Sequence, residues 1–412
     1  MSEAIAQPRR LTMTGKWPTL VLLSIATLLG MSVWFSASAV VPQLTLLWQL
    51  DDSGRAWLTM SVQIGFVVGA LGSSLLNLAD RLPARWMMSI SSVLAALATA
   101  SIAAFASSLG PALVLRFLTG VVLAGVYPVA MKTMATWTKA DRGLGIGLLV
   151  GALTLGSGAP HLINASGGIG DWEYVLYLAA ALAAAGGLIS ALFVRDGPYA
   201  TRAPRFNWRH VGAILRDREI MLANLGYLGH MWELFAMWAW LPVFLLASFG
   251  TLGLDLSLAS VLSFAFFAAG ALGSVLAGKI ADRIGRTAVT SLLLGISGAC
   301  ALTIGFLFGG PVIPLVAVSL IWGFAVVADS AQYSASVSEL CDERYVGTTL
   351  TLQTSLGFLL TLFTIRLIPS LVALVGWEWA FVVLALGPMV GIWAMLALRR
   401  SPAAVRLAEG RR

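Results

Sequence analysis

Charged residues and cysteines are both scarce in this sequence. Lys, Arg, Asp and Glu make up 11% of the 412 residues, whereas soluble domains carry about 25%. Such a composition excludes an ordinary soluble protein. The two cysteines, Cys300 and Cys341, have no partner at metal-ligand spacing, so we predict neither a disulfide nor a metal site. No Ser/His/Asp set, phosphate loop or metal motif is recognisable, and enzyme activity is therefore not predicted.

Apolar residues are abundant instead. They make up 58% of the chain, and the mean hydropathy is +0.88. A run of about 20 apolar residues is long enough to cross a bilayer as a helix. We therefore predict an all-α, polytopic membrane protein with 12 transmembrane helices, at about 17–42, 57–78, 84–107, 111–131, 143–166, 172–194, 219–247, 257–279, 287–309, 312–333, 346–369 and 376–398.

The basic residues are unevenly distributed between these runs. Most of the 26 Lys and Arg residues fall at the termini and in the even-numbered turns. The positive-inside rule places that side in the cytoplasm, so we expect a multi-pass protein of a bacterial-type inner (plasma) membrane with both termini cytoplasmic. The net charge of +7 then reflects orientation in the lipid bilayer, and it indicates no nucleic-acid partner. The first run is too long for a cleaved signal peptide.

An internal repeat divides the chain into halves. The pentapeptide Gly-Ala-Leu-Gly-Ser occurs at 69–73 and again at 270–274, and an Ala-Asp-Arg turn follows each copy. The sequence predicts an N-terminal six-helix bundle at 1–194, a cytoplasmic linker at 195–218 and a C-terminal six-helix bundle at 219–412. The linker carries six arginines, which favour contact with anionic headgroups.

Two motifs resemble those of a known family. A loop motif between the second and third predicted helices recurs between the eighth and ninth, and an Arg-x3-Gly motif lies in the fourth: Gly72, Asp80, Arg81 and Arg85; Gly273, Asp282, Arg283 and Arg286; Arg116 and Gly120. The chain resembles the major facilitator superfamily over its whole length. The first loop copy departs from the pattern at Pro83, and the fifth helix only loosely resembles the antiporter signature. The stretch from Lys132 to Gly143 is similar to that region of organic-anion porters.

This resemblance implies a monomeric secondary transporter. It implies that two six-helix halves alternate access to a small-molecule substrate between them, with no cofactor beyond an ion gradient such as the proton gradient. The solute site is expected at mid-depth, on the first, fourth, seventh and tenth helices.

The loop motifs are candidate gates. An aspartate at one helix end and an arginine at the next can pair across the two halves, and such a pair must break when that side opens. The predicted gating residues are Asp80, Arg81, Arg85, Asp282, Arg283 and Arg286. The alternative is that these charges only fix topology.

Few ionisable groups lie within the apolar runs, and these are candidates for proton coupling. His230 and Glu233 are three residues apart, on one face of the seventh helix, and Asp329 lies in the tenth. Burial disfavours the charged form of both side-chain types, so either can exchange a proton during transport. The alternatives are that Glu233 pairs with Arg366 and that His230 is a structural hydrogen-bond donor.

Arginines within the membrane favour an anionic solute. Arg116 and Arg366 can hold a carboxylate or phosphate with two hydrogen bonds, although each can also extend to the membrane surface. Aromatic and amide side chains complete the predicted substrate-binding set: Trp34, Arg116, Tyr127, Asn164, Trp238, Tyr333, Gln353 and Arg366.

The sequence thus favours a proton-coupled carrier of a small anion that works by alternating access. The main alternative is proton-driven efflux of apolar or cationic compounds, in which Glu233 and Asp329 serve both cargo and proton. A channel or receptor is a further alternative, but no filter-like loop, acidic ring or sensory domain is recognisable.

Overall fold

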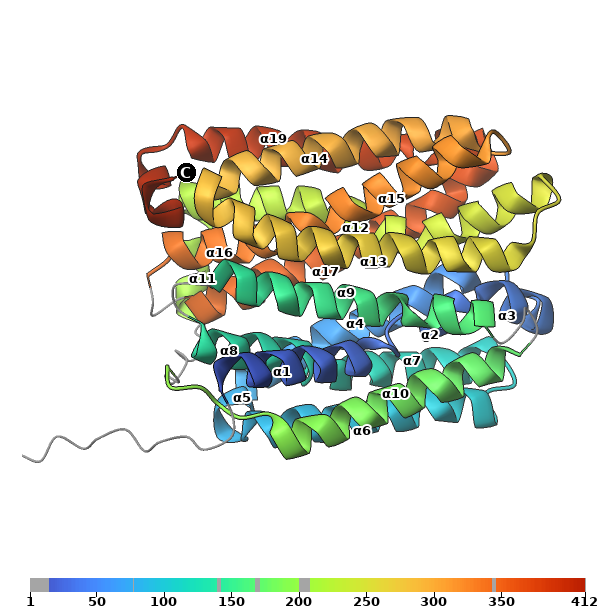
Figure 1. Ribbon diagram of the computed structural model, residues 1–412, viewed down its shortest axis with the longest axis horizontal. Helices are drawn as coiled ribbons and strands as arrows, with labels where there is room; N and C mark the ends of the chain where they lie inside the picture. The colour runs from blue at the N-terminus through green and yellow to red at the C-terminus, as the bar shows by residue number, and fades with distance from the viewer. Residues whose placement is uncertain are drawn as a thin grey trace, which may run out of the picture.

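The computed structural model describes residues 15–76, 78–138, 142–166, 171–199, 208–342 and 346–411. Within these ranges the chain is helical and contains no strand, which confirms the predicted all-α fold. The helices run side by side along the long axis of the molecule. In Figure 1 the blue-to-green helices of the N-terminal half lie below the yellow-to-red helices of the C-terminal half.

Each half is a six-helix bundle with short additional helices. The N-terminal half contains α1 (Lys16–Met31), α2 (Ser36–Ala39), α3 (Val41–Trp48), α4 (Asp52–Leu76), α5 (Leu78–Arg81), α6 (Ala84–Phe105), α7 (Leu109–Leu123), α8 (Tyr127–Trp137), α9 (Arg142–Ser166) and α10 (Trp172–Phe193). The C-terminal half contains α12 (Arg218–Thr251), α13 (Leu256–Ile284), α14 (Arg286–Thr303), η1 (Ile304–Leu307), α15 (Val312–Ala328), α16 (Ser330–Leu340), α17 (Val346–Val375), α18 (Trp377–Ala380), η2 (Val382–Ala385), α19 (Leu386–Arg399) and η3 (Pro402–Gly410). Between them lies α11 (Trp208–Ile214); the linker residues 200–207 are outside the described ranges.

The first membrane segment differs from its prediction. Eleven spans in the described part of the chain are long and apolar enough to cross a membrane, and α1 is a shorter apolar helix. This first segment, expected as one run at 17–42, is instead broken into α1, α2 and α3 and extends to Trp48. The first break is a turn at residues 32–35.

Two more segments are interrupted near mid-depth. The fourth breaks between α7 and α8, and the tenth breaks between α15 and α16 at Asp329. Tyr127, the first residue of α8, matches Asp329 across the sequence repeat. Non-helical backbone at membrane depth is tolerated only where protein covers it or where it lines a cavity. The breaks therefore indicate the interior of the bundle, where a transport site is expected.

Small residues set the close packing of neighbouring helices. A Cβ at Gly273 would lie 2.6 Å from the backbone oxygen of Phe324, which brings α13 against α15, and Gly69 approaches the backbone of Val121 in the same way. The repeated pentapeptide is therefore a helix-packing strip in both halves. A second strip joins the halves, because a Cβ at Gly147 in α9 would lie 2.6 Å from the backbone oxygen of Ser274 in α13.

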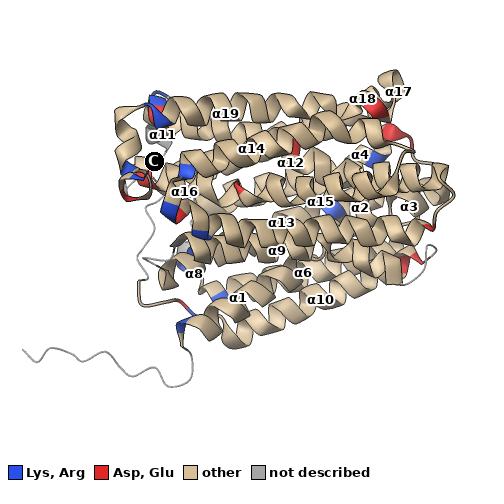
Figure 2. Cartoon of the chain, turned by 45° about the horizontal axis from the view of Figure 1, so that its top comes forward, with Lys and Arg blue, Asp and Glu red and all other residues tan. Residues whose placement is uncertain are grey.

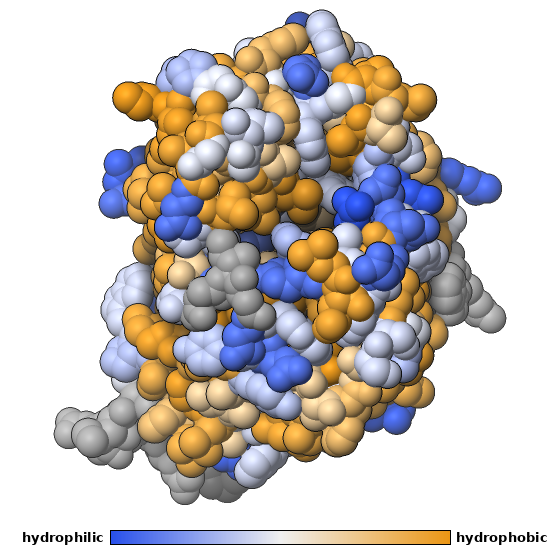
Figure 3. Space-filling model, turned by 90° about the vertical axis from the view of Figure 1, so that its right-hand side faces the viewer, coloured by the Kyte–Doolittle hydropathy of each residue, from blue (hydrophilic) through white to orange (hydrophobic). Residues whose placement is uncertain are grey.

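The two ends of the bundle differ in charge. Lys and Arg gather at the end that holds the C-terminus and the start of α1, which we call the basic end (Figure 2). Figure 3 shows the opposite end, where hydrophilic residues gather towards the middle among apolar ones. The apolar sides of the helices lie between these two ends, as a membrane-spanning bundle requires.

Candidate functional site

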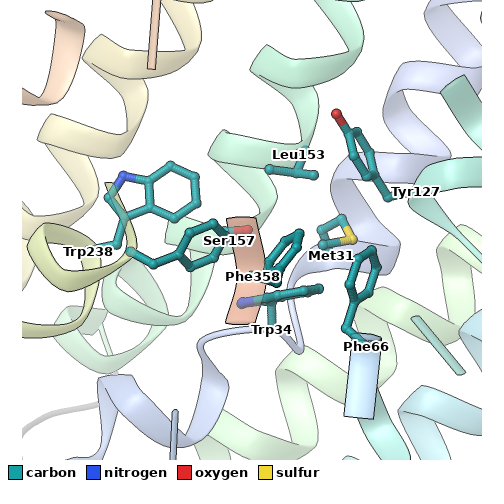
Figure 4. A pocket seen from close by; sticks show the side chains of 9 residues that line it. Met31, Trp34, Phe66, Tyr127, Leu153, Ser157, Trp238 and Phe358 are labelled. Atoms are coloured by element: carbon teal, nitrogen blue, oxygen red, sulfur yellow. The ribbon is translucent and has the colours of Figure 1, made fainter. Parts of the chain in front are cut away.

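A central cavity lies between the two halves. Its free volume is about 20 Å³, and it is lined by Met31, Trp34, Phe66, Tyr127, Leu153, Ser157, Phe235, Trp238 and Phe358. These residues come from both halves, and Figure 4 shows their side chains converging around Ser157. This free volume is room for about one water molecule, so the lining rings nearly close the cavity in the state that the structure describes.

Aromatic rings form most of the cavity wall. The ring of Phe358 lies 4.8 Å from that of Phe66, 5.0 Å from that of Phe235 and 5.7 Å from that of Trp34. Trp238 packs on Phe235 at 5.3 Å. Among the lining residues, all within the described ranges, there is no Lys, Arg, Asp or Glu. The structure thus brings Trp34, Tyr127 and Trp238, three of the predicted substrate-binding residues, together in an uncharged aromatic cavity.

Arg116 is buried but does not line this cavity. Its Nη1 donates to the backbone oxygen of Val33 at 2.8 Å, its Nε donates to that of Leu58 at 3.1 Å, and its Nη2 donates to that of Trp34. Val33 and Trp34 lie in the turn that breaks the first segment. The guanidinium therefore supplies hydrogen bonds to backbone groups around the break, and it neither contacts the cavity nor extends to the surface.

Arg366, a predicted substrate-binding residue, does not lie at the central cavity. Its side chain is exposed on α17 and is absent from the cavity lining. The alternative pairing of Arg366 with Glu233 is also wrong, because Glu233 is 1% exposed and its Oε1 accepts from Trp322. Arg366 lies on the outside of the bundle, where its long side chain can extend toward the membrane surface.

The remaining predicted substrate residues lie outside the cavity lining. Asn164 accepts from Gln43 at 3.0 Å, and its Nδ2 lies 3.4 Å from Ser260 Oγ of the other half. Gln353 donates to Asn224 at 2.9 Å inside the C-terminal half. The Tyr333 hydroxyl donates to Asp329 at 2.6 Å. Of these three residues, Asn164 alone has described hydrogen bonds to both halves.

The three predicted proton-coupling residues, His230, Glu233 and Asp329, form two separate buried contacts in the C-terminal half. His230 Nδ1 lies 2.9 Å from Asp329 Oδ1, and its Nε2 lies 2.8 Å from Ser330 Oγ. Glu233 instead accepts from Trp322 Nε1 at 2.6 Å. His230 and Glu233 share one face of α12, as predicted, but they contact different parts of the tenth segment. Asp329 and Glu233 are both 1% exposed.

The second loop motif joins the halves at the basic end. The carboxylate of Asp282, at the end of α13, lies against Gly143 in the first turn of α9, since a Cβ on Gly143 would be 2.6 Å from Asp282 Oδ1. A carboxylate near the N-terminus of a helix is favourable because of the helix dipole. Asp282 also lies 3.5 Å from Arg286. Asp282 thus contacts the other half, as its predicted gating role requires, but its partner there is the N-terminus of α9 and not an arginine.

Glu339 was not predicted, yet it holds Arg286 in place. Arg286 donates to its two carboxylate oxygens at 2.6 and 2.8 Å, and to Gln332 at 2.8 Å. The same carboxylate accepts from the backbone of Ala408 in the C-terminal segment at 3.0 Å. The sequence contained one signal for this contact: Glu339 is an acidic residue among the basic residues at this end of the bundle, so it could have been predicted to pair with an arginine.

Among the described residues, the other charged residues of the two motifs show no comparable contact between the halves. Arg283 and Arg81 are exposed, and Arg85 lies over the ring of Trp86 at 5.3 Å. Asp80 lies in α5, but its side chain is outside the described part of the structure. On this side the halves meet through Ser74 and Thr351, whose hydroxyls are 3.2 Å apart.

Comparisons with known proteins agree on one family. A family model described as Major Facilitator Superfamily matches residues 22–252 and 225–412. Two solved structures share the fold with a TM-score of 0.68 each. A mutant of the nucleoside transporter NupG is 17% identical, covering 92% of this chain and 99% of that one. The proton:xylose symporter XylE, bound to 6-bromo-6-deoxy-D-glucose, is 15% identical, covering 93% and 95%. No curated protein matches the sequence.

Proposed function

Because the chain belongs to the major facilitator superfamily, we propose that it is a secondary transporter of a small, largely apolar solute, either neutral or cationic. The observation that carries this proposal is the aromatic cavity between the halves, which has no charged lining residue among those described. Aromatic faces favour apolar rings and also attract cations. Of the two solute classes that the sequence left open, the proposal therefore takes apolar or cationic compounds and not small anions.

The cavity gives less support to an anionic solute. An anion in an apolar cavity needs a cation or several donors, and without them its desolvation is strongly unfavourable. The donors of Arg116 are bonded to the backbone, and Arg366 lies outside the bundle. The two solved neighbours are a nucleoside transporter and a proton:xylose symporter, but at such low identity the cavity itself carries the argument.

We further propose that transport is proton-coupled and that the basic end faces the cytoplasm of an inner membrane. Two carboxyl groups, Glu233 and Asp329, are almost fully buried in the C-terminal half. A charge at this depth is costly, so such groups usually serve ion or proton transfer. Glu233 hydrogen-bonds to the neutral Trp322, and a single proton on that carboxyl removes its charge. The basic end satisfies the positive-inside rule.

Ligand-dependent stabilisation of the purified protein tests the solute class. Three probes share one ring system and carry a neutral, a cationic or an anionic substituent: naphthalenemethanol, naphthylmethyl-trimethylammonium and naphthoate. Binding to the folded state raises the melting temperature, and the rise grows with the ratio of ligand concentration to Kd. We expect the neutral or the cationic probe to stabilise the protein and naphthoate to have no effect. Stabilisation by naphthoate alone would contradict the proposal and support the anionic alternative.

A further inference from the structure

The C-terminal segment folds back onto the basic end of the bundle. After α19, η3 (Pro402–Gly410) packs against α16, and Figure 1 shows it in dark red beside the C-terminus. The side chain of Leu407 is fully buried, whereas Val405 of the same segment is 53% exposed. Arg406 Nη1 donates to the backbone oxygen of Leu340 at 2.9 Å. The segment is therefore docked through a buried apolar side chain and a hydrogen bond.

The docked segment contacts the second loop motif. The carboxylate of Glu339 accepts from the backbone of Ala408 at 3.0 Å, and it also accepts from Arg286 at 2.6 and 2.8 Å. Arg411 donates to the backbone oxygen of Asp282. The side chain of Asp282 in turn reaches the first turn of α9 in the other half. The segment thus holds this loop from two sides, through Glu339 and through Asp282 itself.

Two residues of the segment have a backbone conformation that is unfavourable for their type. Ala408 has a φ of 46° and Glu409 has a φ of 57°, in the left-handed region that residues other than glycine disfavour. Such a conformation persists where the surrounding contacts hold it. Here those contacts are the burial of Leu407 and the hydrogen bond from Ala408 to Glu339. The conformation of the segment therefore depends on its docking.

The N-terminal half has a related segment that lacks the charged contacts. Residues 195–198 read Arg-Asp-Gly-Pro after α10, and residues 399–402 read Arg-Arg-Ser-Pro at the end of α19. In the first copy Trp137, at the end of α8, donates from Nε1 to the backbone oxygen of Arg195 at 2.8 Å. Glu339 is at the position that matches Trp137 across the sequence repeat. Only the second copy therefore docks on a carboxylate that also binds a motif arginine.

We propose that residues 402–411, the C-terminal strap, hold the basic end closed. By fixing Arg286 and the backbone of Asp282, the strap keeps the Asp282 carboxylate at the N-terminus of α9, where the helix dipole favours it. This contact must break when the basic end opens, so release of the strap shifts the protein toward the state that is open there. The inference goes beyond the proposed function, because it assigns a regulatory role to the C-terminal segment and does not depend on the solute.

Thiol labelling of the full-length protein with a neutral maleimide tests the strap in the absence of any solute. Ser74→Cys reports on the basic end, and Asn164→Cys reports on the opposite end, each in a background with Cys300 and Cys341 replaced by Ser. Leu407→Ser removes the buried anchor of the strap. We expect labelling at Ser74→Cys to become about threefold to tenfold faster, a part of the effect of burying a leucine side chain. Labelling at Asn164→Cys should become no faster.

A second variant and two matched controls accompany Leu407→Ser. Val405→Ser changes an exposed side chain of the same segment and should leave both labelling rates unchanged. Arg406→Gln keeps the buried anchor and removes the hydrogen bond to Leu340. It should speed labelling at Ser74→Cys by about twofold to tenfold, the range of one net hydrogen bond. Arg400→Gln, at an exposed arginine, removes the same charge and should leave that rate unchanged.

The two reporters separate a strap from a segment that only stabilises the fold. Faster labelling at Ser74→Cys alone supports the strap. An unchanged or slower rate there in Leu407→Ser overturns it, and so does faster labelling at both reporters, because the whole protein is then loosened. If Leu407→Ser does not fold, Arg406→Gln decides, and a rate equal to that of Arg400→Gln overturns the strap. Such a failure leaves the proposed function in place, because no solute takes part in the measurement.

Discussion

The guanidinium of Arg116 hydrogen-bonds to backbone carbonyls around a broken helix. At membrane depth no water is available to these carbonyls, and an unpaired backbone group there is costly. Arg116 satisfies Val33 and Trp34 in the turn and also Leu58 in α4. It thereby fixes the position of Trp34, whose ring lines the cavity. Its contribution to the site is positioning.

Removal of this side chain should destabilise the whole N-terminal half. Arg116→Met keeps length and apolar volume but leaves the carbonyls without a donor, and we expect the free energy of unfolding to fall by about 3 kcal/mol. The measurement is thermal or denaturant unfolding in detergent. Arg366→Met, at the exposed arginine of α17, is the control and should have little effect. Equal stability of both variants would contradict the role assigned to Arg116.

Glu233 is the residue through which proton coupling is most directly tested. Glu233→Gln preserves an acceptor for Trp322 Nε1 but cannot bind and release a proton. In vesicles we expect solute accumulation driven by a pH gradient to be at least about tenfold lower in the variant, because the proton-transfer group is removed. Exchange of labelled for unlabelled solute should persist.

The control for Glu233 is Glu378→Gln, at an exposed residue of α18. It should accumulate solute as the native protein does. Unchanged gradient-driven accumulation in Glu233→Gln would leave Asp329, paired with His230 at 2.9 Å, as the candidate proton carrier.

Residue roles could be predicted only in part. The sequence identified Arg116 and Arg366 as equally good ligands, since both are cations near the end of an apolar run. One is buried and the other exposed. In a chain that is 58% apolar, periodicity separates the inner and outer faces of a helix poorly. For the same reason Phe66, Phe235 and Phe358 could not be distinguished from lipid-facing rings.

At the scale of whole helices, α9 and α13 form the closest contact between the halves. Gly147 allows the backbone of Ser274 to approach, and Gly278 allows that of Gly143. The carboxylate of Asp282 reaches the first turn of α9 at the same end. A side chain at Gly143 would occupy the place of that carboxylate.

Gly143→Ala is therefore expected to open the basic end. Its Cβ would overlap Asp282, so the two helices must separate and the favourable carboxylate–dipole contact weakens. The measurement is thiol labelling of Ser74→Cys, which lies at the other contact between the halves, with Cys300 and Cys341 replaced by Ser. We expect labelling to become severalfold faster, because a loss of about 0.3–1 kcal/mol is a factor of about two to five.

Gly72→Ala is the matched control for Gly143→Ala. A Cβ at Gly72 meets nothing within 4 Å, so the labelling rate should stay unchanged. If Gly143→Ala also leaves the rate unchanged, Asp282 does not hold the basic end closed, and its charge serves topology alone.

The positions of the membrane-spanning helices were more predictable from the sequence than the breaks within them. Eleven of the predicted runs appear as spans in the described chain, because length and hydropathy are local properties. The break in the first segment is not local: Arg116 in α7 supplies the donors that the turn requires. Glu339 was missed for a similar reason, since its partner Arg286 lies on another helix.

For the molecule as a whole, the halves touch on both sides of the cavity. Ser74 and Thr351 meet at the basic end, and Asn164 and Ser260 meet toward the opposite end. Gln63 and Thr361 form a third contact at 2.6 Å. A solute can leave the central cavity only if one set of contacts opens, which is the requirement of alternating access.

Cross-links at the two ends test alternating access directly. Ser74→Cys with Thr351→Cys should hold the basic end closed when joined by a short thiol cross-linker, and Asn164→Cys with Ser260→Cys should hold the opposite end closed. In a background without Cys300 and Cys341, we expect either cross-link to abolish solute flux through vesicles. Solute should still bind from the end that remains free to open. Each single-cysteine variant is the control and should transport after the same treatment.

These two cross-links also distinguish a carrier from a channel. In a carrier the two ends open in turn, so closing the basic end favours the state that is open at the other. Labelling at Asn164→Cys should therefore become faster when the basic end is held closed through a non-thiol linkage between positions 74 and 351. A channel opens both ends together, so the same linkage would leave the labelling rate at Asn164→Cys unchanged or lower it. A slower rate at Asn164→Cys would thus contradict alternating access even if flux were lost.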